Sequence, residues 1–180
     1  MIRTFVAVFP PQDVREALFR AARDLRVSKD FRLVGQEKIH LTLKFLGDVA
    51  EKDLGGVEEA LHPVRESHRP FEVSTSGFGA FPSEQRARIL WAGIEQGSEH
   101  LRTLAEEVET LLAPAGFERE NRPYLPHLTL GRARARRTKL DPSETSAPPR
   151  LRFTVGGVDL VKSVRGEKGV TYSTLATFPF

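Results

Sequence analysis

Cysteine is absent from this 180-residue chain, which excludes disulfides, thiolate metal ligands, iron–sulfur clusters and a cysteine nucleophile. Long apolar runs are absent too: 28% of the residues are charged, and no stretch approaches the roughly 18 residues of a membrane span. No basic segment followed by an apolar one opens the chain, so we expect no secretion signal and a soluble, cytoplasmic protein. Any chemistry must then use His, Ser or Thr, carboxylates or basic side chains.

The chain also lacks a large excess of one charge sign: it has 27 Lys and Arg and 24 Asp and Glu residues, which give a net charge of +3. Such a balance permits an anionic partner without requiring one. The length suits one domain with a single core.

Hydrophobic periodicity predicts alternating strands and helices. We expect Gly47-Asp48 to form a turn after the second strand. The predicted strands are Ile2–Phe9, Ile39–Leu46, Phe71–Phe81, Arg88–Ile94 and Val170–Phe178, and the predicted helices are Val14–Leu25 and Glu51–Arg65.

The most informative feature is an internal repeat. The tetrapeptide HLTL occurs at residues 40–43 and 127–130, so a shift of 87 residues superimposes the two copies. The same ungapped shift lays Ile2–Phe9 over Ile89–Gln96 and matches the apolar positions of the first helix with those of a second, from Leu101 to Leu112. Farther along, FEVSTSGFG from Phe71 resembles FTVGGVDL from Phe153. We therefore expect one bilobal domain over residues 1–180, with repeat units of roughly 1–88 and 89–180.

Each HLTL copy presents a His and a Thr together. Because side chains alternate along a strand, His40 and Thr42 lie on one face, roughly 7 Å apart, and the leucines point the other way. The same holds for His127 and Thr129. If the two repeat units pack around an approximate two-fold axis, both pairs face one shared cleft.

Two opposed imidazoles suit phosphoryl transfer that needs no metal. With ordinary pKa values near 6.5, one ring can accept a proton at neutral pH while the other donates one. Thr42 and Thr129 can donate hydrogen bonds to non-bridging phosphate oxygens, and Arg132 can balance the developing charge. Arg132 falls on the face opposite to Thr129, so this role requires a twist or a bulge at Gly131.

A basic run follows the second copy and leads into a Pro- and Ser-rich loop. Such a run forms either a solvated face or a contact to a phosphate backbone, and its position after HLTL favours the contact. The run comprises Arg132, Arg134, Arg136, Arg137 and Lys139.

The other histidines, His62, His68 and His100, have no partner at a ligand spacing, and we expect them at the surface. A metal held by His40 and His127 would lack a carboxylate placed by the repeat, so we expect no metal. Trp91 and most Phe residues lie in strand patterns and are expected in the core.

Five stretches of the sequence resemble the two-histidine phosphoesterases, and within them the RNA 2',3'-cyclic phosphodiesterases also called 2'-5' RNA ligases. The stretches are RTFVAVFPP at the start, HLTLKFLGDV from His40, RPYLPHLTLGR from Arg122, LVKS from Leu160 and GVTYSTLATF near the end. The resemblance implies an α+β fold of two pseudo-symmetric αβ lobes, each an antiparallel sheet with outer helices, around a central cleft.

The resemblance also implies hydrolysis of RNA 2',3'-cyclic phosphate ends, or of small cyclic nucleotides, to 2'-phosphomonoesters, with no cofactor. It makes His40 the proton donor to the departing 3' oxygen and His127 the proton acceptor, a choice that the residues alone leave open. Thr42, Thr129 and Arg132 match the phosphate-holding positions. The chain departs from the family where RLVG precedes the first motif in place of an aromatic residue, and at Gly131, where the family usually has Ala.

Three alternatives stay open at this point. The same site could join RNA ends reversibly through a 2'-5' linkage, it could act on a small cyclic nucleotide alone, or the protein could be a non-catalytic RNA-binding module. We expect no membrane association and see no sign of an obligate protein partner.

Overall fold

The computed structural model describes residues 1–135, 138–141, 150–167 and 169–180. The strands are β1 (Ile2–Val8), β2 (Phe31–Leu33), β3 (Leu41–Val49), β4 (Phe71–Phe81), β5 (Ile89–Ile94), β6 (His127–Ala133), β7 (Arg152–Val155), β8 (Gly157–Gly166) and β9 (Gly169–Pro179). The α-helices are α1 (Gln12–Arg23), α2 (Leu54–Leu61), α3 (Val64–Ser67) and α4 (Ser98–Leu112).

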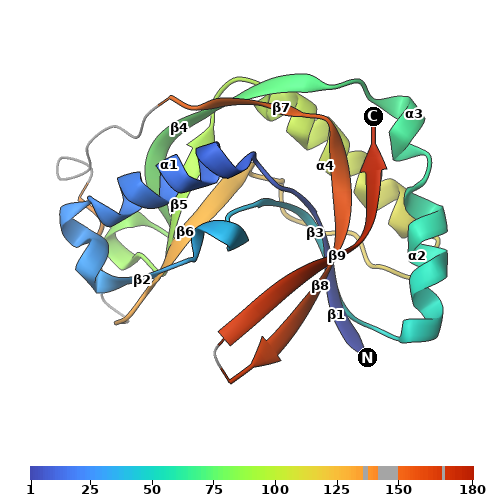
Figure 1. Cartoon of the computed structure of the whole chain (residues 1–180), viewed down its shortest axis with the longest axis horizontal. Coiled ribbons are helices and arrows are strands. Elements are labelled where there is room, and N and C mark those ends of the chain that lie inside the picture. The colour runs from blue at the N-terminus through green and yellow to red at the C-terminus, as the bar shows by residue number, and fades with distance from the viewer. Residues whose placement is uncertain (136–137, 142–149, 168) are drawn as a thin grey trace.

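The strands form one strongly curved antiparallel sheet (Figure 1). Its order is β7-β4-β5-β6-β3-β1-β8-β9, with β2 beside β6. At the centre, Leu41 of β3 pairs with Leu128 of β6, and these two residues are equivalent in the sequence repeat. Outward from this pair, the strands on the two sides correspond in order: β3, β1, β8 and β9 on one side match β6, β5, β4 and β7 on the other. The expected α+β fold with two pseudo-symmetric halves is confirmed.

The two repeat units are interwoven in the sheet. Strand β4 of the first unit pairs with β5 of the second, and β8 of the second pairs with β1 of the first. The helices cross over as well, because α1 contacts β2 and β6 while α4 contacts β3. Each half of the sheet, to either side of the central β3–β6 pair, therefore contains strands from both units. The boundary between the units near residues 88 and 89 stays a prediction.

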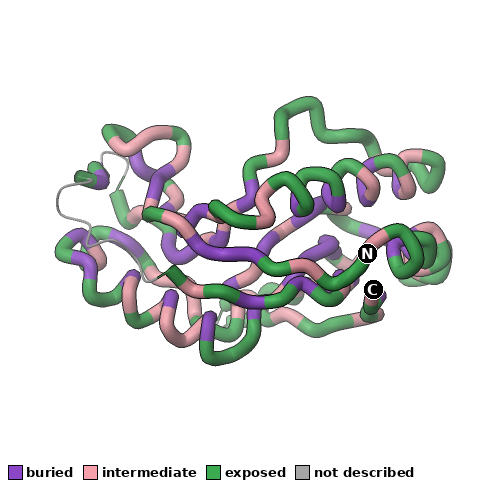
Figure 2. Tube along the Cα trace, turned by 90° about the horizontal axis from the view of Figure 1, so that it is seen from above, coloured by how far each residue is buried: buried purple, intermediate pink, exposed green. Residues whose placement is uncertain are grey.

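The main core lies between the sheet and the helices. Helix α1 buries Val14 and Leu18 there because they recur at helical spacing, and the leucines of both HLTL copies point into the same core. Figure 2 shows the buried stretches running through the middle of the molecule. Alternate β1 residues face the other side, where Phe5 and Ala7 pack against Val161 of β8. The motif polar side chains lie on this second face.

Two predicted elements differ from the structure. The helix expected over Glu51–Arg65 is broken into a 3₁₀ turn, α2 and α3, because Pro63 lacks the amide donor that a continuous helix needs. The turn expected at Gly47-Asp48 is wrong: β3 continues through it, and Gly47 adopts a φ of 73° where the register with β1 shifts.

Two residue matches predicted from the sequence repeat differ from the correspondence that the strand pairing gives. Val8 pairs with Leu41 and Ala92 pairs with Leu128, so Val8 corresponds to Ala92, three residues before the match given by the ungapped shift. Strand β4 corresponds to β8 by its place in the sheet. The match of Phe71 with Phe153 is therefore wrong; these similar segments are neighbouring strands, since β4 pairs with β7.

Candidate active site

The two His-Thr pairs come together where β3 and β6 meet. His40 directly precedes β3, Thr42 lies within it, and His127 and Thr129 lie in β6. Leu41 and Leu128, between them in sequence, are fully buried and paired. The four polar side chains therefore lie on the opposite face of adjacent antiparallel strands, where all are half-buried.

The ring of His40 is fixed at both nitrogens. Nδ1 lies 2.6 Å from the carbonyl oxygen of Lys38, and Nε2 lies 3.0 Å from Oγ1 of Thr42. When Nδ1–H donates to the carbonyl, Nε2 of the neutral ring accepts the hydroxyl proton of Thr42. The ring stacks on Phe5 at 4.9 Å between centroids and meets the edge of Tyr172 at 5.4 Å.

His127 is held in the same way. Its Nδ1 lies 2.7 Å from the carbonyl oxygen of Leu125, which occupies the position equivalent to Lys38. The ring meets Phe81 edge-on at 5.0 Å and lies 6.4 Å from Trp91. Because each Nδ1 is engaged by backbone, Nε2 of each histidine is the atom available for proton exchange with a ligand.

The surroundings lower the pKa of both histidines. Burial lowers the pKa of His40 to about 4, the Lys38 carbonyl opposes this shift, and the charge on protonated His127 adds to it. Burial also lowers the pKa of His127, against the opposing Leu125 carbonyl. Burial thus shifts both rings toward the neutral form in the unliganded protein, and the division into one proton donor and one proton acceptor stays a prediction.

A bulge of the kind that Arg132 requires is present in β6. Trp91 lies opposite Thr129, but Leu90 lies opposite Gly131, so β6 carries one extra residue at Leu130. A bulge of this kind restores Arg132 to the face of Thr129. The Arg132 side chain is exposed.

Strand β3 has the matching bulge, with Ala7 opposite Thr42 and Val6 opposite Lys44. Phe45 consequently occupies the position equivalent to Arg132, and its ring is 70% exposed. The two halves of the site therefore differ in chemistry: one presents an aromatic ring and the other a guanidinium.

Further arginines gather on the His127 side. Arg32 of β2 pairs directly with Arg132, an arrangement of like charges that is unfavourable unless an anion lies nearby. Arg86 and Arg88 line a hollow of about 380 Å³ together with Phe81, whose ring contacts His127. Arg134 is exposed, whereas Arg136 and Arg137 of the predicted basic run lie outside the described residues.

The remaining histidines lie away from the motifs. His62 and His100 are exposed, as expected. His68 is not a surface residue: its side chain is 11% exposed and its Nε2 lies 2.7 Å from Glu107 of α4. A larger hollow of about 680 Å³ is lined by His62, Arg65 and Phe180 near α3 and contains none of the motif residues.

Sequence reasoning missed the aromatic side chains around the two rings. Trp91 was expected in the core but is half-buried beside His127, and Phe5 and Tyr172 come from β1 and β9. Of these aromatic residues, only Phe5 could have been predicted from the sequence, because alternation along β1 places it on the face opposite to Val6. Across residues 1–135, 138–141, 150–167 and 169–180, no three His, Asp or Glu side chains group as a metal site requires.

In the part of the chain that the structure describes, no helix has the length and apolar character to cross a membrane.

Comparisons with known proteins find similar sequences and structures. The sequence model of the 2'-5' RNA ligase superfamily matches residues 10–167. An RNA 2',3'-cyclic phosphodiesterase of Archaeoglobus fulgidus is 32% identical over 179 residues, which cover 98% of this chain and 99% of that protein. A crystal structure from Thermus thermophilus superposes with a TM-score of 0.84 at 30% identity, covering 98% and 97% of the two chains. E. coli LigT complexed with 3'-AMP shares the fold, with a TM-score of 0.84 at 24% identity over 99% and 98%.

Proposed function

Because this chain belongs to the 2'-5' RNA ligase superfamily, we propose that it hydrolyses RNA 2',3'-cyclic phosphate ends to 2'-phosphomonoesters by metal-independent acid–base catalysis. The observation that carries the proposal is the meeting of two His-Thr pairs on one face of β3 and β6, each with its ring anchored by a backbone carbonyl. Curated relatives with the name RNA 2',3'-cyclic phosphodiesterase support the same activity.

The reaction needs one base and one acid on opposite sides of phosphorus. His127 Nε2 takes a proton from water, whose oxygen attacks phosphorus, while His40 Nε2–H gives a proton to the departing 3' oxygen. This division of roles is the one that the family resemblance implies, and burial lowers the pKa of both rings. After hydrolysis His127 carries the extra proton and His40 lacks one, so His127 must lose a proton to solvent and His40 must gain one before the next turnover.

Thr42, Thr129 and Arg132 are assigned to the phosphate. In the free protein the Thr42 hydroxyl is bonded to His40 Nε2. Protonation of that nitrogen releases the hydroxyl, which can then donate to a non-bridging oxygen. Arg132, brought to this face by the bulge, balances the charge that develops in the transition state.

We expect Thr42→Val and Thr129→Val each to lower kcat by about 10²-fold, since an oxyanion donor is removed without a change in side-chain shape. Thr42→Ser and Thr129→Ser keep the hydroxyl and should retain most activity. Steady-state kinetics on a nucleoside 2',3'-cyclic phosphate provide the measurement. Equal activity of the Val and Ser variants would remove the hydroxyls from the mechanism.

The function itself is tested with an oligonucleotide that ends in a 2',3'-cyclic phosphate, incubated with the protein in excess chelator. The expected product carries a 2'-phosphate only. A 3'-phosphate product would overturn the choice of bond, and loss of activity in chelator with recovery on adding a divalent metal would overturn the metal-independent mechanism.

The same assay separates the alternatives. If an RNA with a 5'-hydroxyl is added, a joined 2'-5' product would indicate ligation. Turnover of a mononucleotide but not of the oligonucleotide would restrict the substrate to small cyclic nucleotides. Binding of the oligonucleotide with no turnover would indicate an RNA-binding module.

The arginines beside His127 predict a longer RNA contact. Replacing Arg32 and Arg134 by Gln should raise KM for an oligonucleotide several-fold while leaving KM for the mononucleotide nearly unchanged, because neither side chain is assigned to the reacting phosphate. The slope of log KM against log salt should fall by about one for each lost phosphate contact. Arg23→Gln and Arg102→Gln, on α1 and α4, where each arginine pairs with an exposed carboxylate, are charge-matched controls. Equal effects on both substrates would remove these arginines from the RNA path.

A further inference from the structure

A buried ion pair joins the His40 strand to the segment that leads to His127. Lys44 Nζ donates to Glu109 Oε2 at 2.5 Å and to the carbonyl oxygen of Glu118 at 2.7 Å. The side chains of Lys44 and Glu109 are only 4% and 12% exposed. Glu109 comes from α4, so three separate elements meet at one ammonium group.

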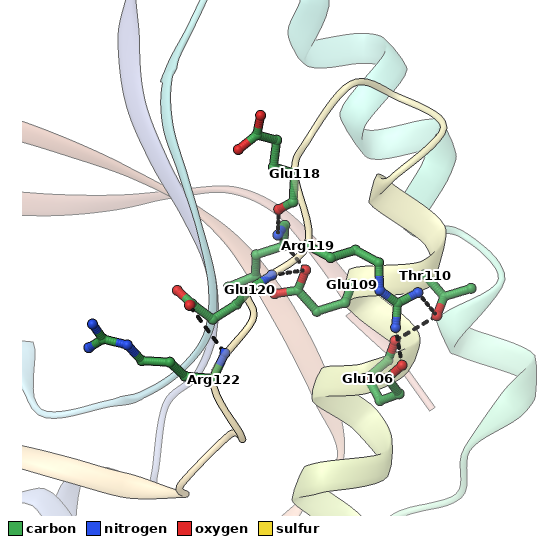
Figure 3. A network of polar contacts seen from close by, with 8 residues as sticks. Glu106, Glu109, Thr110, Glu118, Arg119, Glu120 and Arg122 are labelled. Atoms are coloured by element: carbon green, nitrogen blue, oxygen red, sulfur yellow. Dashed lines mark hydrogen bonds and ion pairs between the residues drawn. The ribbon is translucent and has the colours of Figure 1, made fainter.

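The segment after α4 is fastened at several points (Figure 3). The amide of Glu120 donates to Glu109 Oε2 at 3.3 Å, so this carboxylate bridges Lys44 and the segment. The guanidinium of Arg119 donates to Thr110 and Glu106 of α4. From here the chain runs through residues 121–126 directly into His127.

In the other repeat unit, backbone pairing between two strands takes the place of these side-chain contacts. Under the 87-residue shift, residues 118–120 correspond to β2 and Lys44 corresponds to Gly131. Strand β2, which precedes His40, pairs with β6 through backbone, with Leu33 opposite Gly131. A Cβ at Gly131 would lie 3.3 Å from atoms of Phe31, Arg32 and Leu33, so a side chain there would crowd β2. In the other half a Lys side chain fills that space and reaches a carbonyl.

Each histidine is therefore preceded by a segment that is fastened to the strand of the other histidine. One connection is a backbone ladder, between β2 and β6; the other is the ammonium of Lys44 with its Glu109 partner. A buried ion pair with directional bonds fixes a separation in a way that apolar contacts of equal volume do not.

We propose that Lys44 is a positioning residue, which with Glu109 fixes the segment before His127 to the His40 strand and so sets the separation of the two imidazoles. This inference rests on the proposed function, in which both rings act on one phosphate. Lys44 touches no reacting atom and acts only through the position of His127.

The test compares Lys44→Met with the double variant Lys44→Met, Glu109→Met. The single variant leaves the buried Glu109 carboxylate without its cationic partner, and we expect a lower Tm together with lower kcat. In the double variant apolar packing replaces the ion pair, so we expect Tm to recover most of this loss, with a remainder from the Glu118 carbonyl and the Glu120 amide, which lose their partners. Its kcat should stay at least about tenfold low with a smaller change in KM, because a displacement near 1 Å costs about 10²-fold at a catalytic group. A double variant with unmodified kcat would overturn the proposal.

Glu107→Gln is the matched control on the same helix. It removes the ion pair with His68, so Tm should fall while kcat stays unchanged. If Glu107→Gln lowers kcat as much as the double variant does, the effect is one of general stability and the positioning role is wrong.

The ¹⁵N resonances of the histidine rings give a readout that does not require turnover. In the double variant those of His127 should shift or broaden and those of His68 should not. Unchanged His127 resonances overturn the proposal even if the unmodified protein hydrolyses nothing. If the unmodified protein shows no turnover but the His127 resonances shift in the double variant, only the proposed function is overturned.

Discussion

His40→Asn and His127→Asn are each expected to lower kcat by about 10²–10⁴-fold, the contribution of one positioned proton donor or acceptor. Asn keeps polarity and approximate shape near the Nδ1 atom that bonds Lys38 or Leu125, so the fold should persist. Circular dichroism and thermal unfolding check the fold, and single-turnover kinetics on a cyclic-ended oligonucleotide check the rate.

The double variant distinguishes a pair from two independent groups. If both rings act in the same step, removing the second after the first should cost far less than the product of the single effects. His100→Asn, an exposed ring stacked on Phe71, is the control and should retain full activity. Multiplicative losses, or a variant of one motif histidine with normal kcat, would contradict the account.

The second large effect is on the pH dependence of kcat/KM. Catalysis needs one neutral and one protonated imidazole, and both pKa values in the free protein lie below 6.5, with that of His40 at about 4. We therefore expect a maximum of kcat/KM at acidic pH and a tenfold decline per pH unit toward neutral and alkaline pH, as the last proton is lost. A bound phosphate anion raises both pKa values, so the kcat profile should lie at higher pH than the kcat/KM profile. A kcat/KM plateau from pH 6.5 to 8 would contradict this prediction.

The same shift makes stability depend on pH. The folded-state pKa of His40 is depressed, so the unfolded chain binds its proton more readily between about pH 6.5 and 4. Stability is then constant above pH 6.5 and is lost as the pH falls toward 4, by about 2–3 kcal/mol from this ring. Urea unfolding at pH 7.5 and 4.5 should show that loss in the unmodified protein and less of it in His40→Asn. An equal loss in both proteins would show that His40 is not the group responsible.

Much of the fold followed from the repeat. Two identical HLTL copies fix one offset, and Leu41 pairs with Leu128 at that offset in the centre of the sheet. Strand alternation correctly separated the buried leucines from the polar pair. The need for a twist or a bulge at Gly131 followed from counting positions to Arg132, and the register of β6 contains a bulge.

What the sequence could not provide depends on contacts between distant elements. Tyr172 reaches His40 from β9, so the desolvation that lowers the pKa of this ring has no local signal. The exchange of β4 and β8 between the halves is likewise a matter of tertiary pairing. In the sequence, Lys44 occupies an ordinary polar position of a predicted strand. Its ammonium group is buried because of the bulge at Leu43 and the approach of α4.

The account rests on one claim, that His40 and His127 address the same phosphate. Its most direct test is a titration of the ¹⁵N-labelled protein with inorganic phosphate in excess chelator, followed at the histidine Nε2 resonances. We predict that the Nε2 signals of His40 and His127 shift together with a single Kd and that both pKa values rise, while those of His62 and His100 stay unchanged. A response of one motif ring alone, or two responses with different Kd values, would contradict the claim.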